Sequence, residues 1–190
     1  MGGSISRESY LDTGLDVLSD QGYGGLKLAE VCSRLGVTTG SFYHYFSSWS
    51  VYGEELVTRW AQTAGVNSKI HAEPDPRRRI DILIQGALTL RYGAEAGIRV
   101  WSSMDPTVHR AQASVDRQRF DLLSASALEV LGDEQQARRF ATTAMYLLVG
   151  CEQSTLPRVP EDLEWVAGRL LAALDLGVFA DSQTQAEAPG

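Results

Sequence analysis

Apolar residues recur along most of this chain at the spacing of α-helices. Positions three and four apart are apolar in almost every segment, and no stretch shows the strict alternation of a β-strand. Glycine, proline and short polar residues interrupt this pattern. The pattern predicts helices over residues 6–21, 28–35, 50–67, 76–92, 106–131, 133–153 and 161–176. It also predicts a short helix that begins at residue 38 or 39 and ends at 45 or 46, and another short helix through Trp101, flanked by Gly93 and Gly97. We therefore expect an all-α fold.

The polar pair Ser47–Ser48 interrupts the helical pattern near residue 49, and we expect a domain boundary there. This divides an N-terminal three-helix domain, residues 1–49, from a helical domain of residues 50–179. The remaining residues, 180–190, are small and polar, which is typical of a disordered tail.

Composition narrows the class of protein. The chain has 190 residues, enough to bury a core without disulfides, and a formal net charge of −7. Cys32 and Cys151 lie far apart in apolar helical surroundings, which favours reduced thiols. No apolar run reaches membrane-spanning length, and the N-terminus lacks a signal-peptide layout. We expect a cytoplasmic protein with no membrane partner.

Catalytic motifs are missing from the sequence. It contains no nucleophile elbow, phosphate-binding loop or HExxH pattern. The histidines, His44, His71 and His109, have no metal-ligand spacing to one another or to the cysteines. We therefore predict no enzyme activity, no catalytic or metal-binding residues and no cofactor.

The most informative stretch lies between Lys27 and Phe46 and reads KLAEVCSRLGVTTGSFYHYF. Its pattern predicts a helix, a sharp turn at Gly36, and a second short helix with an exposed polar start. Short hydrogen-bonding side chains and an aromatic on such a helix suit the major groove of DNA. The alternative interpretation is an ordinary helical hairpin with a polar surface.

The same stretch resembles the TetR family of repressors. The resemblance covers about residues 7–56 and rests on a first helix ending at Gly22, the Gly36–Val37 turn, the small residues 38–41, the aromatic residues 42–45 and Phe46. It implies a DNA-binding helix-turn-helix domain followed by a helical domain that binds an effector and dimerises. It also implies a repressor that a small, mostly apolar effector releases from a palindromic operator.

The resemblance assigns candidate roles to individual residues. Tyr43 would contact backbone phosphate, and Gly40 would let the helix approach DNA closely. The complete set of candidate DNA-binding residues is Lys27, Thr38, Thr39, Gly40, Ser41, Tyr43 and His44. Candidate effector-binding residues, aromatic or polar side chains in the helical domain, are Trp60, Tyr92, Trp101, His109, Arg119 and Tyr146. The alternative for each member of the second set is a place in the core.

Two residues depart from the family pattern. Lys27 stands near the start of the second helix, where the family has a capping Thr or Ser, and Trp49 stands where the family often has Lys. Basic residues are also few: before residue 61 they are Arg7, Lys27, Arg34 and Arg59, against seven acidic residues. These features predict weak non-specific affinity for DNA. They also keep open the alternative of a dimeric ligand- or protein-binding module that has lost DNA binding.

The last two helices carry strongly apolar stripes. One stripe consists of Phe140, Ala141, Ala144, Leu147, Leu148 and Cys151. The other consists of Leu163, Val166, Ala167, Leu170, Leu171 and Leu174. Such a pair can form half of a four-helix bundle between two subunits. The alternative is that both stripes face the core of their own domain. We expect a homodimer that binds double-stranded DNA.

Overall fold

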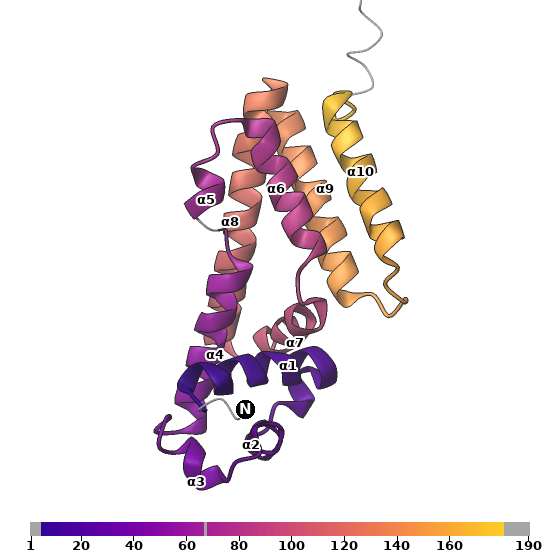
Figure 1. Ribbon diagram of the computed structural model, residues 1–190. Coiled ribbons are helices and arrows are strands. Elements are labelled where there is room, and N and C mark those ends of the chain that lie inside the picture. Colours follow the sequence, from indigo (N-terminus) through magenta and orange to yellow (C-terminus); the bar gives the residue numbers. More distant parts are fainter. Residues whose placement is uncertain (1–4, 67, 181–190) are drawn as a thin grey trace, which may run out of the picture. The chain divides into compact units, whose positions relative to one another are not determined.

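Helices make up almost all of the computed structural model, which describes residues 5–66 and 68–180 (Figure 1). The all-α prediction is confirmed. The helices in the described ranges are α1 (Arg7–Gly25), α2 (Leu28–Leu35), α3 (Thr39–Phe42), α4 (Trp49–Ala64), α5 (Ser68–His71), α6 (Pro76–Leu88), α7 (Tyr92–Ser102), α8 (Pro106–Leu131), α9 (Glu134–Gln153) and α10 (Pro160–Asp175).

Side-chain caps determine where several helices begin. The Ser6 hydroxyl accepts a hydrogen bond from the Ser9 amide, and the Ser9 hydroxyl reciprocates, so α1 starts with a capping box. Ser48 caps α4 by accepting from the Val51 amide. Asp133 caps α9 in the same way. Each cap satisfies backbone donors that the first helical turn leaves unpaired.

Some boundaries differ from the sequence predictions. α1 continues to Gly25 beyond a break at Gly22, whose φ of 66° lies in the left-handed region. α3 ends at Phe42, earlier than predicted, and α6 ends at Leu88. Gly93 and Gly97 lie inside α7 and do not flank it. The short helix α5 was not predicted.

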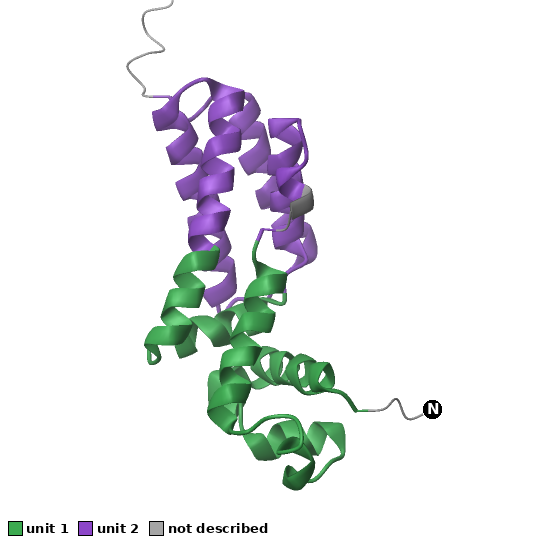
Figure 2. Ribbon diagram, turned by 90° about the vertical axis from the view of Figure 1, so that its left-hand side faces the viewer, with its two compact units in different colours: residues 1–65, 91–115 green, residues 66–90, 116–190 purple. Residues whose placement is uncertain are grey.

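The chain divides into two compact units, each built from segments that are far apart in sequence (Figure 2). Unit 1 contains residues 1–65 and 91–115, and unit 2 contains residues 66–90 and 116–190. The predicted division at residue 49 concerns functional domains and stays a prediction. The predicted disordered tail, 180–190, lies outside the described residues except for Ala180.

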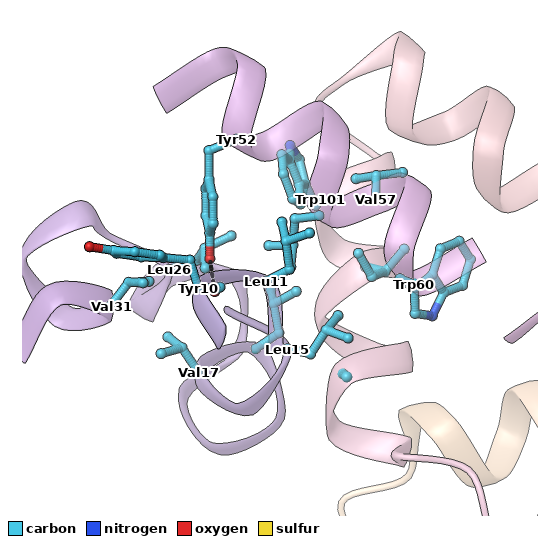
Figure 3. Packing of buried hydrophobic residues seen from close by; sticks show 14 of the residues in the cluster. Tyr10, Leu11, Leu15, Val17, Leu26, Val31, Tyr52, Val57, Trp60 and Trp101 are labelled. Atoms are coloured by element: carbon cyan, nitrogen blue, oxygen red, sulfur yellow. Dashed lines mark hydrogen bonds between the residues drawn. The ribbon is translucent and has the colours of Figure 1, made fainter. Parts of the chain in front are cut away.

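Unit 1 has an aromatic and aliphatic core. Tyr10, Leu15 and Val17 of α1 lie among Tyr52 and Trp60 of α4, together with side chains from α2 and α7 (Figure 3). α7 packs closely on α1, because a Cβ added at Gly93 would lie 2.2 Å from the Ser19 carbonyl oxygen. Residues 91–115 are thus part of the packing of unit 1.

Unit 2 has a core built from α6, the second part of α8, α9 and α10. Six of the stripe residues are buried there, namely Phe140, Ala141, Ala144, Ala167, Leu170 and Leu174, whereas Leu147 is 38% exposed. The structure therefore supports the second interpretation of these particular residues, in which they face their own core. No helix in the described part of the chain combines the length and the apolar character needed to cross a membrane.

Candidate nucleic-acid interface

The turn between α2 and α3 has the geometry that the sequence predicts. Gly36 ends α2 with a φ of 66°, a conformation that costs glycine least. The Val37 amide then donates to the Cys32 carbonyl at 3.0 Å and closes the turn. Val31 and Phe42 are completely buried, so the two helices are held together by apolar packing. The spacing of the motif therefore yields a helix-turn-helix.

α3 is a single helical turn that presents small polar groups to solvent. The Thr38 hydroxyl accepts from the Ser41 amide at 3.4 Å and caps the helix. Thr39, Gly40 and His44 are exposed. A Cβ added at Gly40 would meet only the Thr38 hydroxyl, at 3.6 Å, so nothing within the protein requires glycine there.

Ser41 differs from its neighbours because its side chain is half-buried. The hydroxyl of Tyr10, a completely buried residue, donates to the Ser41 hydroxyl at 3.1 Å. Ser41 therefore joins α3 to α1. From the sequence Ser41 is expected to face outward like its neighbours, because nothing in a run of small polar residues indicates a bond to a buried tyrosine 31 positions earlier.

The two departures from the family pattern have different surroundings. Lys27 is exposed at the N-cap of α2 and makes no side-chain capping bond. Trp49, the first residue of α4, is half-buried and stacks on Tyr52 with ring centroids 4.8 Å apart. It also lies against Phe42, at 5.8 Å. Trp49 thus extends the aromatic core at a position where the family often has a lysine.

Buried aromatic rings support α3 from below. Phe42 and Phe46 stack at 5.1 Å, and Tyr10 meets both rings edge-on. The Tyr52 hydroxyl donates to the Tyr10 carbonyl at 2.9 Å (Figure 3). Burial raises the pKa of Tyr52 far above its ordinary range, so this donor keeps its proton. These ring contacts fix the position of α3 on the core of unit 1.

Ion pairs occupy three of the four basic side chains that precede residue 61. Arg34 contacts Glu30 and Asp20 at 2.8 and 2.7 Å. The Arg34 guanidinium also lowers the pKa of Glu30. Arg59 pairs with Asp12 at 3.1 Å, and Arg7 pairs with Glu55.

Lys27 is the one basic residue before residue 61 for which the described structure shows no ion pair. The cationic character of this surface is therefore low.

The candidate effector-binding residues do not all lie in the same unit. Trp60 is buried in unit 1, where its indole N–H donates to the Glu95 carboxylate at 2.8 Å. Trp101 is also buried and stacks on Tyr23, with centroids 5.0 Å apart. Tyr92 is half-buried and His109 is exposed.

Arg119 and Tyr146 belong to unit 2. Arg119 is buried and forms an ion pair with Glu152, 3.7 Å between nitrogen and oxygen, whereas Tyr146 is 76% exposed. Glu95 and Glu152 were not singled out from the sequence, because a lone glutamate in a helix is ordinarily solvated.

The described residues contain no candidate metal-binding site. Among the described residues, His, Cys, Asp and Glu form no group of three or more that could hold a metal ion.

The fold and the site together define a class of protein, one with an N-terminal helix-turn-helix and a further helical unit. Residues 11–48 match the model of a family described as bacterial regulatory proteins, tetR family. The match contains α2, the turn and α3, with the supporting aromatic residues. The N-terminal helix-turn-helix of this chain is therefore similar to that of the TetR family of transcriptional regulators.

Individual relatives agree with this assignment. The chain is 24% identical over 130 residues to the HTH-type transcriptional regulator BetI of Proteus mirabilis, an alignment that covers 63% of this chain and 65% of that protein. The chain thus spans slightly less than two thirds of that relative's length.

Solved structures share the fold over most of the chain. A transcriptional regulator from Rhodococcus sp. Rha1 is 22% identical, with a TM-score of 0.68 covering 91% of this chain and 97% of its own. A regulator from Saccharomonospora viridis in complex with choline is 15% identical, with a TM-score of 0.70 over 87% of this chain and 95% of its own.

Proposed function

We propose that this chain is a cytoplasmic repressor that binds a palindromic operator in double-stranded DNA as a homodimer. A small, mostly apolar effector releases it from DNA. The observation that carries the proposal is the exposed polar turn of α3, which rests on a buried aromatic base within the family's DNA-binding motif. A helix of this size enters the major groove and reads base edges through its side chains.

The exposed groups on and around α3 suit two kinds of contact with DNA, one with base edges and one with backbone phosphates. Thr39 and His44 carry hydrogen-bonding groups suited to base edges or phosphates, and Gly40 leaves room for the DNA backbone. Tyr43, 55% exposed, and Lys27 suit phosphate oxygens. Thr38 and Ser41 contribute through their backbone and through the hydroxyl hydrogens that their internal bonds leave available.

Dimerisation is supported by the outer faces of α9 and α10. Tyr146 and Leu147 are exposed on α9, and Trp165 is 65% exposed on α10. Each helix also carries an exposed glycine, Gly150 or Gly168, at which an added Cβ would meet nothing. Large apolar side chains beside small residues favour close packing of helices from two subunits.

The effector is proposed to combine apolar surface with one charged group. The buried pair Arg119 and Glu152 supplies charged side chains within a largely apolar helical unit. Choline, which is bound to the Saccharomonospora relative, is a small cation surrounded by methyl groups and is the first compound to test. Its uncharged isostere 3,3-dimethylbutan-1-ol is the matched control. Choline should raise the melting temperature and weaken DNA binding, and the isostere should do neither.

The decisive experiment is selection of binding sites from a random duplex library with the purified protein, followed by anisotropy at two salt concentrations. The proposal expects an enriched palindrome and a stoichiometry of one dimer per site. Because Lys27 is the basic residue before residue 61 for which the described structure shows no ion pair, the salt dependence should be shallow, with a log–log slope of about −2 to −4.

The alternative function is a dimeric ligand- or protein-binding module that has lost DNA binding. The shortage of basic side chains near α3 favours it. If no sequence is enriched at low salt, with or without choline, the repressor proposal is wrong and the binding-module alternative is favoured.

A further inference from the structure

Arg7, the first residue of α1, joins three segments of unit 1 through a single guanidinium group. Its Nε donates to one carboxylate oxygen of Glu55 in α4 at 2.7 Å, and a terminal nitrogen donates to the other oxygen. The remaining terminal nitrogen donates to the backbone carbonyl of Tyr45. The guanidinium carbon also lies 4.5 Å from the centroid of the Phe46 ring.

The segment that Arg7 holds follows directly after α3. A helix of four residues is too short to be stable by itself, so its direction depends on tertiary contacts. After it, the Tyr45 and Phe46 amides both donate to the Phe42 carbonyl, at 2.9 and 3.0 Å. Tyr43 and His44 lie between these points, so the placement of both exposed side chains depends on how residues 45 and 46 are fixed.

A second bond fastens the same segment to the residues just before α1. The Tyr45 hydroxyl donates to the Ile5 carbonyl at 2.7 Å. Tyr45 therefore binds the start of α1 through its side chain and through its carbonyl oxygen. These contacts come from residues about forty positions apart in the sequence, which shows that the start of α1 is part of the support for α3.

The charge of Arg7 is already neutralised by this arrangement. Both carboxylate oxygens of Glu55 accept from Arg7, and the guanidinium holds the pKa of Glu55 below its ordinary value. Two parallel hydrogen bonds of this kind fix the orientation of the guanidinium relative to the carboxylate as well as the distance between them. Arg7 therefore has three of its five N–H donors committed within the protein, and its charge is balanced by Glu55, which weakens its attraction for a DNA phosphate.

We propose that Arg7 is a positioning residue for DNA recognition: with Glu55 as its anchor on α4, it fixes the segment 43–46 and hence the exposed end of the recognition motif. The proposal rests on the proposed function for its effect on DNA, but the clamp itself is a property of the protein alone. The rival explanation is that Arg7 neutralises a phosphate directly.

The substitutions Arg7→Lys and Glu55→Gln separate these two explanations. Arg7→Lys keeps the positive charge but cannot form the two parallel hydrogen bonds to Glu55. Glu55→Gln removes the negative charge that balances the charge of Arg7. Asp12→Asn is the matched control, because it breaks the Arg59–Asp12 pair, which also joins α1 to α4 but does not touch residues 43–46.

Binding to the selected duplex is measured by anisotropy over a range of salt concentrations. If Arg7 positions the motif, both variants weaken binding to the selected duplex by about tenfold, comparable to losing one good side-chain contact with a base. Binding to random duplex and the salt slope stay unchanged. Asp12→Asn binds like the unmodified protein. Tighter binding and a steeper slope in Glu55→Gln would overturn the proposal in favour of a phosphate contact.

Hydrogen–deuterium exchange without DNA tests the clamp independently. The amides of Tyr45 and Phe46 should exchange faster in both variants and at the normal rate in Asp12→Asn. Unchanged exchange in both variants would overturn the clamp even if DNA binding fell. If the unmodified protein selects no duplex, the proposed function fails, and the exchange comparison still decides whether Arg7 fixes this segment.

Discussion

Neighbouring hydroxyl residues of the recognition motif have different functions in this structure. Thr38 caps α3, Ser41 accepts from the buried Tyr10, and Thr39 is exposed. In the sequence these residues are equivalent, since each is a small hydroxyl residue within one polar run. Only the burial of Tyr10, which lies 31 positions before Ser41, distinguishes the internal hydroxyl from the external ones.

Alanine substitutions at Thr39 and Ser41 should therefore differ in their effect on stability. Ser41→Ala leaves the buried Tyr10 hydroxyl without its acceptor and should lower the free energy of unfolding by about 1 kcal/mol. Thr39→Ala should change it by less than about 0.5 kcal/mol while weakening DNA binding. Urea unfolding followed by circular dichroism measures the first effect and anisotropy the second. Equal stability of the two variants would contradict the internal role of Ser41.

The acid dependence of stability can be assigned to individual carboxylates. Arg77 donates to both oxygens of Asp175, at 2.6 and 3.0 Å, and these bonds hold the pKa of Asp175 below its ordinary value. A group whose pKa is lower in the folded state stabilises the fold above its unfolded pKa of about 3.9. That contribution disappears as the pH falls through the lower, folded value.

Asp175→Asn should accordingly lower stability at pH 6 and much less at pH 3. Because Asp175 is about half exposed, the difference at pH 6 should be no more than about 1 kcal/mol. Urea unfolding of the variant and the unmodified chain at both pH values measures it. A difference of the same size at both pH values would show that Asp175 acts through packing and not through its charge.

At the scale of elements, local patterns predicted the type of nearly every long helix. The caps and the left-handed glycines Gly22 and Gly36 are local signals, and the helices they bound were found from the sequence. The predicted boundaries of α3 and α7 were less accurate, because the ends of these helices depend on tertiary contacts. In α7, Gly93 and Gly97 were interpreted as helix breakers, whereas the structure uses them for the close approach of α1.

Gly93→Ala tests this explanation of the α7 glycines. The added methyl group would lie 2.2 Å from the Ser19 carbonyl oxygen, so the two helices must separate. We expect a loss of about 1–3 kcal/mol in the free energy of unfolding. Gly86→Ala in α6 is the control, because nothing lies within 4 Å of its Cβ and alanine should add about 0.5–1 kcal/mol. Similar effects of both substitutions would rule out the close packing of α7 on α1.

At the scale of the molecule, the helix-turn-helix motif could be recognised from the sequence, but the division into two units could not. The motif is recognisable because its turn, caps and aromatic residues are contiguous. The units are not contiguous, since residues 91–115 complete the core of unit 1 and residues 66–90 that of unit 2. The supporting groups Arg7, Glu55 and Glu95 escaped notice for the same reason: each acquires its role from a partner distant in the sequence.

Much of each stripe that first suggested a dimer is buried within unit 2. We therefore expect the partner subunit to pack on the exposed residues of α9 and α10, among them Leu147 and Trp165. Trp165→Glu places a charge where the proposed partner subunit packs and should dissociate the dimer. Ile82→Glu, at an apolar residue 38% exposed on α6, is the control and should leave the dimer intact. Sedimentation velocity at micromolar concentration distinguishes monomer from dimer, and circular dichroism verifies that both variants fold.

Loss of the dimer should also abolish tight operator binding, because a palindrome is read by two recognition helices held roughly 34–36 Å apart. A single motif with so few free cations has little affinity of its own. A Trp165→Glu protein that stays dimeric would move the subunit interface away from α10. A monomeric variant that still binds the palindrome tightly would show that the two halves assemble on DNA and not before.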